Sequence, residues 1–146
     1  MTSVIDIDQG ARLAQVTASG TVNRTDIYSL LESLCADPRF RPQMAGLWDM
    51  RQSDPSVSLD DIRSIAIKAR SMATGPCGRT AILASTDYQF GLAMQLQALV
   101  CDRPCEVGVF RRYENALKWL CGGGKSNSPA ECKSIDEHRQ ARRTTR

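Results

Sequence analysis

The sequence predicts an α/β domain in which a mixed sheet of about five strands is packed by four helices, in the order ββαβαβαβα. Near the start of the chain, apolar and polar residues alternate, which is typical of half-buried strands. Further along, segments with apolar residues at helical spacing alternate with short apolar runs. Such alternation indicates a parallel sheet built by right-handed crossovers, here with an antiparallel first strand.

The first two elements are expected to form an antiparallel hairpin. Residues 3–8 alternate apolar and polar, and Asp8-Gln9-Gly10 has the composition of a turn before a second strand over residues 12–18. After that strand, Thr21 or Asn23 is suited to cap a helix, because its side-chain oxygen can accept a hydrogen bond from a free backbone N–H.

Four segments have the apolar spacing of amphipathic helices. The first places Ile27, Leu30 and Leu34 on one face and ends at Asp37-Pro38, since the residue before proline avoids the α region. The other three are expected to begin after Ser58, after Ser85-Thr86-Asp87 and near Tyr113, with the last ending at Gly122-Gly123-Gly124.

Short apolar stretches between these helices predict the parallel strands, at residues 47–50, 80–84 and 106–110. The run Thr80-Ala81-Ile82-Leu83-Ala84 is continuously apolar after its first residue, which suits a central strand buried on both faces. Residues 51–57 are polar and include Pro55, so this stretch is expected to be a loop.

The chain is expected to hold one α/β domain, residues 1–121, and a basic flexible tail, residues 122–146. The domain contains 13 basic and 13 acidic residues, so the whole net charge of +3 lies in the tail. The tail has too little apolar surface to offset its ordering entropy. The domain has no basic stripe, and we therefore expect no nucleic-acid partner.

Neither a membrane span nor a metal centre is indicated. No apolar run approaches the roughly 20 residues that cross a bilayer, and the first residues do not resemble a secretory signal, so a cytoplasmic protein is expected.

The six cysteines include no Cys-x-x-Cys pair, and the single histidine, His138, is in the tail. We therefore expect reduced thiols, no metal and no cofactor, with a Cys101–Cys105 redox pair as the alternative.

An ordered set of short stretches carries a family resemblance. They are Gly20-Thr21-Val22, Asp37-Pro38-Arg39-Phe40, Leu47-Trp48-Asp49-Met50-Arg51, Phe90-Gly91-Leu92-Ala93-Met94, and Val107-Gly108-Val109-Phe110 followed by Ala116-Leu117-Lys118-Trp119-Leu120. Over roughly residues 3–121 the chain resembles the SpoIIAA-like proteins, relatives of the STAS (sulfate transporter and anti-sigma factor antagonist) domains. The resemblance implies the STAS-like fold and a regulatory or interaction role without catalysis, as in small bacterial proteins of no assigned chemistry. A second resemblance, to lipid-binding Sec14-like domains, rests on topology.

Anti-sigma factor antagonists carry an Asp-Ser-Ser-Gly stretch at the start of the second helix, where a serine is phosphorylated. Residues 51–61 of this chain lack that motif. Ser58 has two interpretations here. It is an N-cap that forms a capping box with Asp61, or it is a phospho-acceptor at the positive end of a helix.

Four polar residues are candidates for ligand binding. Asp49 and Arg51 follow the middle strand, and Ser85 and Thr86 follow the next one, where parallel sheets bind ligands outside the carboxyl ends of their strands. The alternative is that Arg51 pairs with Asp49 and that Thr86 caps the third helix. With no histidine in the domain and no spaced carboxylate pair, no catalytic residue is expected.

Two functions stay open. The first is a regulatory or interaction module of STAS type that works as a homodimer or with a protein partner, because Met72, Met94 and Trp119 are surplus apolar residues that a coat of four helices does not fully cover. The alternative for these three residues is that all belong to the core. The second is a carrier that holds a small apolar or anionic molecule at the strand-end crevice. A closed apolar pocket would favour the carrier, and a flat exposed apolar patch would favour the interaction module.

Overall fold

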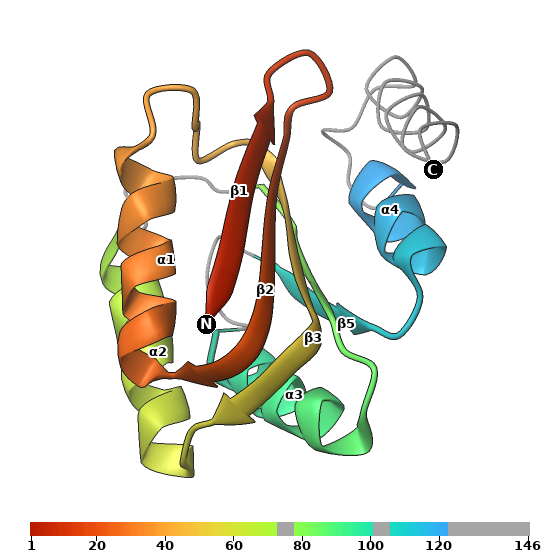
Figure 1. Cartoon of the computed structure of the whole chain (residues 1–146). Helices are drawn as coiled ribbons and strands as arrows, with labels where there is room; N and C mark the ends of the chain where they lie inside the picture. The colour runs from red at the N-terminus through yellow and green to blue at the C-terminus, as the bar shows by residue number, and fades with distance from the viewer. Residues whose placement is uncertain (73–77, 101–105, 123–146) are drawn as a thin grey trace.

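The computed structural model describes residues 1–72, 78–100 and 106–122, and its element order confirms the predicted ββαβαβαβα. Strands and helices follow each other along the chain as shown in Figure 1: β1 (Thr2–Asp8), β2 (Leu13–Asn23), α1 (Arg24–Ala36), β3 (Ala45–Ser56), α2 (Leu59–Met72), β4 (Thr80–Leu83), α3 (Asp87–Val100), β5 (Val107–Phe110) and α4 (Tyr113–Gly122). Apart from Gly122, the expected tail lies outside the described residues, as does the Cys101–Cys105 pair.

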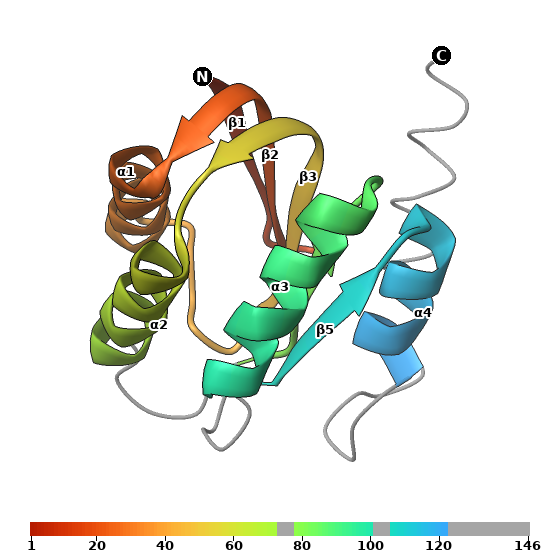
Figure 2. The same cartoon turned by 90° about the horizontal axis from the view of Figure 1, so that it is seen from below.

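The five strands form one sheet in the order β1-β2-β3-β4-β5. β1 runs antiparallel to β2, and the other neighbours are parallel. Successive right-handed crossovers that advance in one direction place their helices on the same face. Accordingly α1, α2 and α3 cover one face of the sheet, whereas α4 follows the last strand and covers the opposite face (Figure 2).

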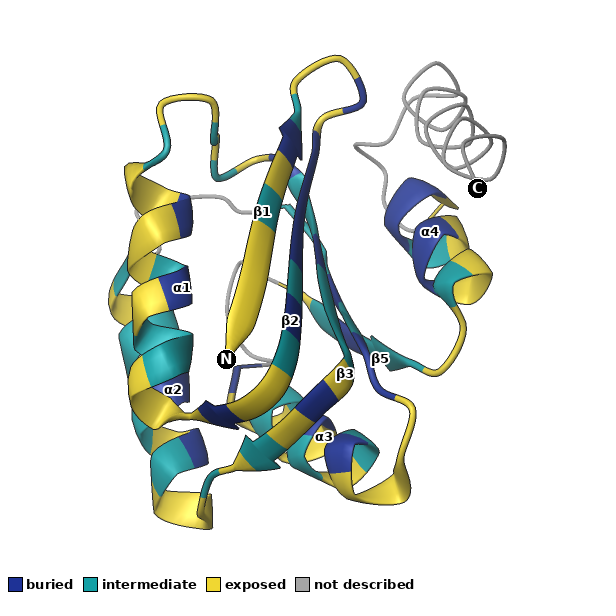
Figure 3. Ribbon diagram, in the orientation of Figure 1, coloured by how far each residue is buried: buried dark blue, intermediate teal, exposed yellow. Residues whose placement is uncertain are grey.

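Each face has its own packed core, and α1 and α4 turn their buried residues toward the sheet (Figure 3). On the α4 face, Leu47 and Leu83 are fully buried against Leu117 and Leu120. The α1 face buries residues of β2 and of the helix, namely Ala14, Val16, Ala18, Val22, Leu30 and Leu34. Alternation along each strand therefore assigns neighbouring residues to different cores.

Two expectations about the strands are wrong. Residues 51–56 are not a loop, because β3 continues through them to Ser56 and pairs in parallel with residues 19–23 of β2. The strand β4 is not buried on both faces, since Leu83 is fully buried but Ile82 is only half-buried. A polar composition suggested the loop, but backbone pairing with a distant strand decided the structure.

The expectations about the cap of the first helix, the cysteines and membrane spans can be compared with the structure. Asn23 caps α1 in a capping box, with its side chain 2.9 Å from the Asp26 N–H and its own N–H 3.0 Å from the Asp26 carboxylate. Cys35 is a free cysteine, whereas Cys121 is disulfide-bonded, so the expectation of reduced thiols is wrong for Cys121. Within the described ranges, no helix is long and apolar enough to cross a membrane.

Candidate functional site

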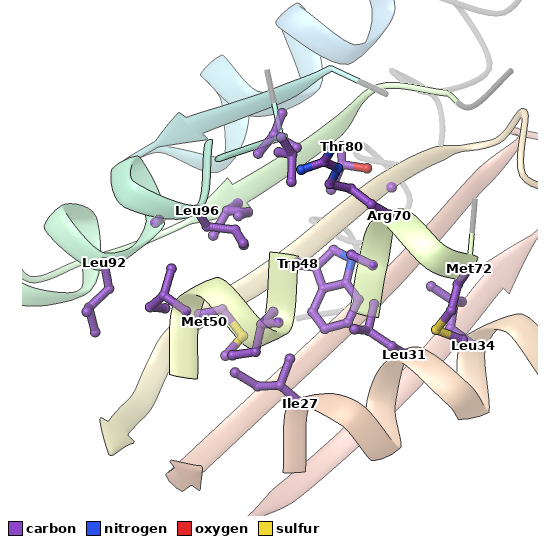
Figure 4. Close-up of a pocket in the computed structure, with 18 of the residues that line it drawn as sticks. Ile27, Leu31, Leu34, Trp48, Met50, Arg70, Met72, Thr80, Leu92 and Leu96 are labelled. Carbon is purple, nitrogen blue, oxygen red and sulfur yellow. The ribbon is translucent and has the colours of Figure 1, made fainter. Parts of the chain in front are cut away.

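A cavity of about 530 Å³ lies between the sheet and the three helices on its α1–α3 face. Apolar side chains make up most of its wall, and Figure 4 shows several of them directed into it from α1, β3 and α3. The wall includes Ile27, Leu31, Leu34, Cys35, Trp48, Met50, Met72, Ile82, Leu92, Ala93 and Leu96.

The position of α2 explains why this space is not filled. α2 packs mainly against α1 and α3, whereas α1 packs on β2 and α3 packs on β5 and β3. α2 therefore contacts its two neighbouring helices and does not pack closely against a strand. Interiors normally reach the density of organic crystals, so a cavity of this size means that the wall residues have apolar surface with no partner.

Exposure along the central strands agrees with this geometry. In β3, Leu47 is fully buried toward α4, but its neighbour Trp48 is only half-buried toward the cavity. In β4, Leu83 and Ile82 show the same contrast. In β3 and β4, the face toward α4 is thus fully buried and the face toward the cavity is only partly covered. Partly covered apolar side chains on central strands are more typical of a ligand site than of a packed core.

The polar groups at one end of the cavity already have partners. Gln89 is buried, and its side-chain carbonyl accepts hydrogen bonds from the Ser85 and Thr86 N–H groups at 2.7 and 3.2 Å. Its amide donates to the Ser53 carbonyl at 2.6 Å, and the Ser53 hydroxyl donates to the Met50 carbonyl at 2.7 Å. This end of the cavity is therefore a satisfied polar network, which links α3 to β3.

The other polar residues of the wall are Arg70, near the end of α2, and Thr80, at the start of β4. Figure 4 shows the Arg70 side chain directed toward Thr80. Cys35 lies on the wall from α1, and partial burial raises the pKa of its thiol. The cavity therefore combines an apolar interior with a cationic group on its wall.

The four predicted binding residues come together, but outside the cavity wall. The Arg51 guanidinium donates two hydrogen bonds to the Asp49 carboxylate, at 2.9 and 2.8 Å, and this contact raises the pKa of the guanidinium. The Ser85 hydroxyl donates to the Arg51 carbonyl at 2.9 Å. Thr86 caps α3 by accepting from the Gln89 N–H at 3.1 Å. Ligand binding by these four residues stays a prediction.

Ser58 lies at the N-terminus of α2. Its hydroxyl accepts a hydrogen bond from the Asp61 N–H at 3.1 Å, and its own N–H donates to the Asp61 carboxylate at 2.9 Å. This is a capping box, and it supplies a structural role for both side chains. Phosphorylation of Ser58 stays a prediction. Among residues 1–72, 78–100 and 106–122, no group of three or more His, Cys, Asp or Glu could hold a metal ion.

Sequence reasoning missed the cavity, because its wall residues have the composition and spacing of core residues. One signal was present: α3 has no charged residue between Tyr88 and Val100, so its apolar residues are not confined to one face. A helix that is apolar around much of its circumference has to cover more than the sheet beneath it.

Comparisons with known proteins assign a fold. No family model matches the chain, and neither does any curated protein. A crystal structure of an uncharacterized protein of the DUF3478 family, with a SpoIIAA-like fold, from Shewanella loihica PV-4, is similar at 24% sequence identity and a TM-score of 0.52. The match covers 82% of this chain and 94% of that one. The chain has a SpoIIAA-like fold, which confirms the expected resemblance at the level of structure.

Proposed function

We propose that this domain is a carrier that binds a small apolar molecule in the cavity between the sheet and α1, α2 and α3. The observation that supports it is the half-buried apolar surface of Trp48, Met50 and Ile82 on central strands beneath α2. The volume of about 530 Å³ lies within the range of roughly 300–1,000 Å³ typical of small-molecule sites. The site differs in place from the strand-end crevice that the sequence suggested.

Burial of apolar surface supplies the free energy of binding at this site. Apolar cavities take up apolar guests, and each Å² of apolar surface removed from water stabilises the complex by roughly 25 cal/mol. The buried amide of Gln89 and the hydroxyl of Ser53 already have partners within the protein. A ligand that enters therefore gains from apolar contacts without having to replace those hydrogen bonds.

Trp48 provides a direct assay, because it lines the cavity while the second tryptophan, Trp119, packs against Phe110 on the α4 face. The Trp119→Phe variant leaves Trp48 as the only tryptophan, and Trp48→Phe leaves Trp119 as the matched control. A fatty alcohol brominated in its chain should quench Trp48 saturably and leave Trp119 unchanged. Equal quenching of both, or no saturable quenching of Trp48, would contradict the proposal.

A substitution that fills the cavity gives an independent test. Ala93 lines the cavity from α3, and its neighbour Met94 is 43% exposed on the outer face of the same helix. We expect Ala93→Phe to abolish quenching of Trp48 by the brominated alcohol and Met94→Phe to preserve it. Circular dichroism verifies that each variant is folded. Should Ala93→Phe fail to fold, Leu96→Trp fills the same space from the next turn, and is measured by displacement of a fluorescent fatty alcohol.

A second candidate, self-association as an interaction module, is favoured by one surface. Tyr88, Met94 and Leu99 of α3 are 56%, 43% and 37% exposed on a helix without charges over that length. The other two residues expected to be in surplus are placed differently: Met72 lines the cavity, and Trp119 packs against Phe110.

A second copy of the chain is the occupant that we propose for this face, since closed twofold pairing is the commonest assembly. Light scattering should then show a dimer that Met94→Glu dissociates. A monomer at every concentration would refute it.

A further inference from the structure

We propose, as an extension of the carrier function and resting on it, that the ligand is a single-chain amphiphile whose anionic head group binds Arg70 while its chain fills the cavity. The proposal names a chemical class, a carboxylate or phosphate monoester on one long saturated chain. It also assigns a binding role to Arg70, a residue that the sequence pattern gave no reason to select.

The charge of the wall is the first argument. Of the described residues that line the cavity, Arg70 alone is charged, and none is acidic. Other cations of the same helix have carboxylate partners, since Arg63 lies 3.7 Å from Asp60 and Lys68 lies 2.9 Å from Glu32. Arg70 makes no hydrogen bond or ion pair with any residue in the described parts of the chain. Arg70 is exposed, so its guanidinium lies at the rim of the apolar cavity without a protein partner, where it is suited to an anion.

The surroundings of Arg70 are the second argument. Its side chain reaches from α2 toward Thr80 (Figure 4), whose hydroxyl can donate to or accept from a head-group oxygen. Gly46, which lies opposite Thr80 in the sheet, also lines the cavity. A Cβ atom at Gly46 would lie 3.4 Å from the Thr80 Oγ1 atom. The absence of a side chain at Gly46 therefore keeps that side of the Thr80 hydroxyl uncovered.

The apolar interior sets the length of the chain. A methylene group occupies roughly the volume of one water molecule in the liquid, ~30 Å³. The cavity of about 530 Å³ therefore corresponds to about 18 such groups. A chain like that of hexadecanoic acid is of about this size. Because the polar groups near Gln89 are already paired, the head group is expected at Arg70 and the chain end toward α3.

The test compares three ligands that differ in the head group alone: hexadecanoic acid, hexadecyl phosphate and hexadecanol. Affinities are measured by the change in Trp48 fluorescence in the full chain carrying Trp119→Phe. Arg70→Gln removes the charge of interest, and Arg63→Gln is the matched control, because it removes an exposed arginine from the same helix outside the cavity wall. Arg70→Lys keeps the charge but loses the fork of the guanidinium.

We expect Arg70→Gln to weaken binding of the two anions roughly tenfold, as for loss of a charge-assisted hydrogen bond, and to leave hexadecanol unchanged. Arg70→Lys should restore part of the loss, and Arg63→Gln should alter no affinity. A preference between the acid and the phosphate identifies the head group.

Two results would overturn the inference while leaving the carrier function in place: equal affinity of Arg70→Gln and the parent for the anions, or an equal loss for all three ligands. If none of the three ligands perturbs Trp48, the carrier function fails as well.

Discussion

Neighbouring residues of one strand offer a sharp test of the cavity. Leu83 and Ile82 are consecutive in β4, and both are aliphatic residues of the same size. Leu83 is 0% exposed within the core against α4, whereas Ile82 is half-buried and lines the cavity. Truncating each to alanine therefore removes similar atoms from two different environments.

The expected magnitudes differ because only one of the truncations creates a new void. Leu83→Ala leaves a void in a packed core and should lower the free energy of unfolding by about 3–4 kcal/mol. Ile82→Ala removes three carbons that are worth about 0.8 kcal/mol each when fully buried. Because Ile82 is only half-buried and the space that it leaves joins an existing cavity, we expect a cost of about 1 kcal/mol.

Urea unfolding of the full chain measures both costs, without reductant so that the disulfide of Cys121 stays intact. With slopes of about 1–3 kcal/mol/M, a loss of 3 kcal/mol lowers the midpoint by about 1–3 M, and a loss of 1 kcal/mol by a third of that. Equal costs for the two variants would mean that both faces of β4 are sealed in solution, which would refute the reasoning that leads to the carrier function.

Three further predictions concern single sites. Gly78→Ala should destabilise the protein by about 2–3 kcal/mol, because its Cβ atom would clash with the Met44 carbonyl oxygen. By contrast, the Cβ atom of Gly91→Ala meets nothing within 4 Å, and this change should stabilise α3 by about 0.5–1 kcal/mol; urea midpoints in the reverse order would contradict this. Asn23→Ala removes the bond of the α1 capping box that the Asp26 N–H donates to the Asn23 side chain and should cost about 1 kcal/mol by thermal unfolding; an unchanged melting temperature would count against it. The raised pKa of Cys35 means less thiolate at a given pH, so alkylation of Cys35 at pH ~8.5 should be slower than that of a cysteine peptide. It should slow further when a ligand fills the cavity. Peptide mapping by mass spectrometry measures both rates, and a faster rate for Cys35 than for the peptide would refute the expectation.

Local chemistry accounts for what could be predicted. The spacing of Ile27, Leu30 and Leu34 predicted the buried face of α1, because residues three and four apart lie on one side of a helix. Ser58 and Asp61 predicted the capping box that begins α2. The alternation of strands and helices predicted the parallel sheet, and the resemblance to a known fold supplied its family. Each of these signals acts over a few residues or over the order of elements.

Tertiary contacts decided the rest. The extension of β3 through residues 51–56 depends on hydrogen-bonding partners in β2, about thirty residues earlier in the chain, which no local pattern reveals. The cavity depends on how closely α2 approaches the sheet, and that distance is set by its packing on α1 and α3. Trp48 and Ile82 are apolar in the sequence, as Leu47 and Leu83 are, because burial in a core and contact with a ligand require the same kind of side chain. Residue types and their spacing establish which side chains avoid water. The packing of three helices establishes which of these side chains keep apolar surface that no protein atom covers, because the gap between the helices and the sheet is a property of their packing and of no single segment.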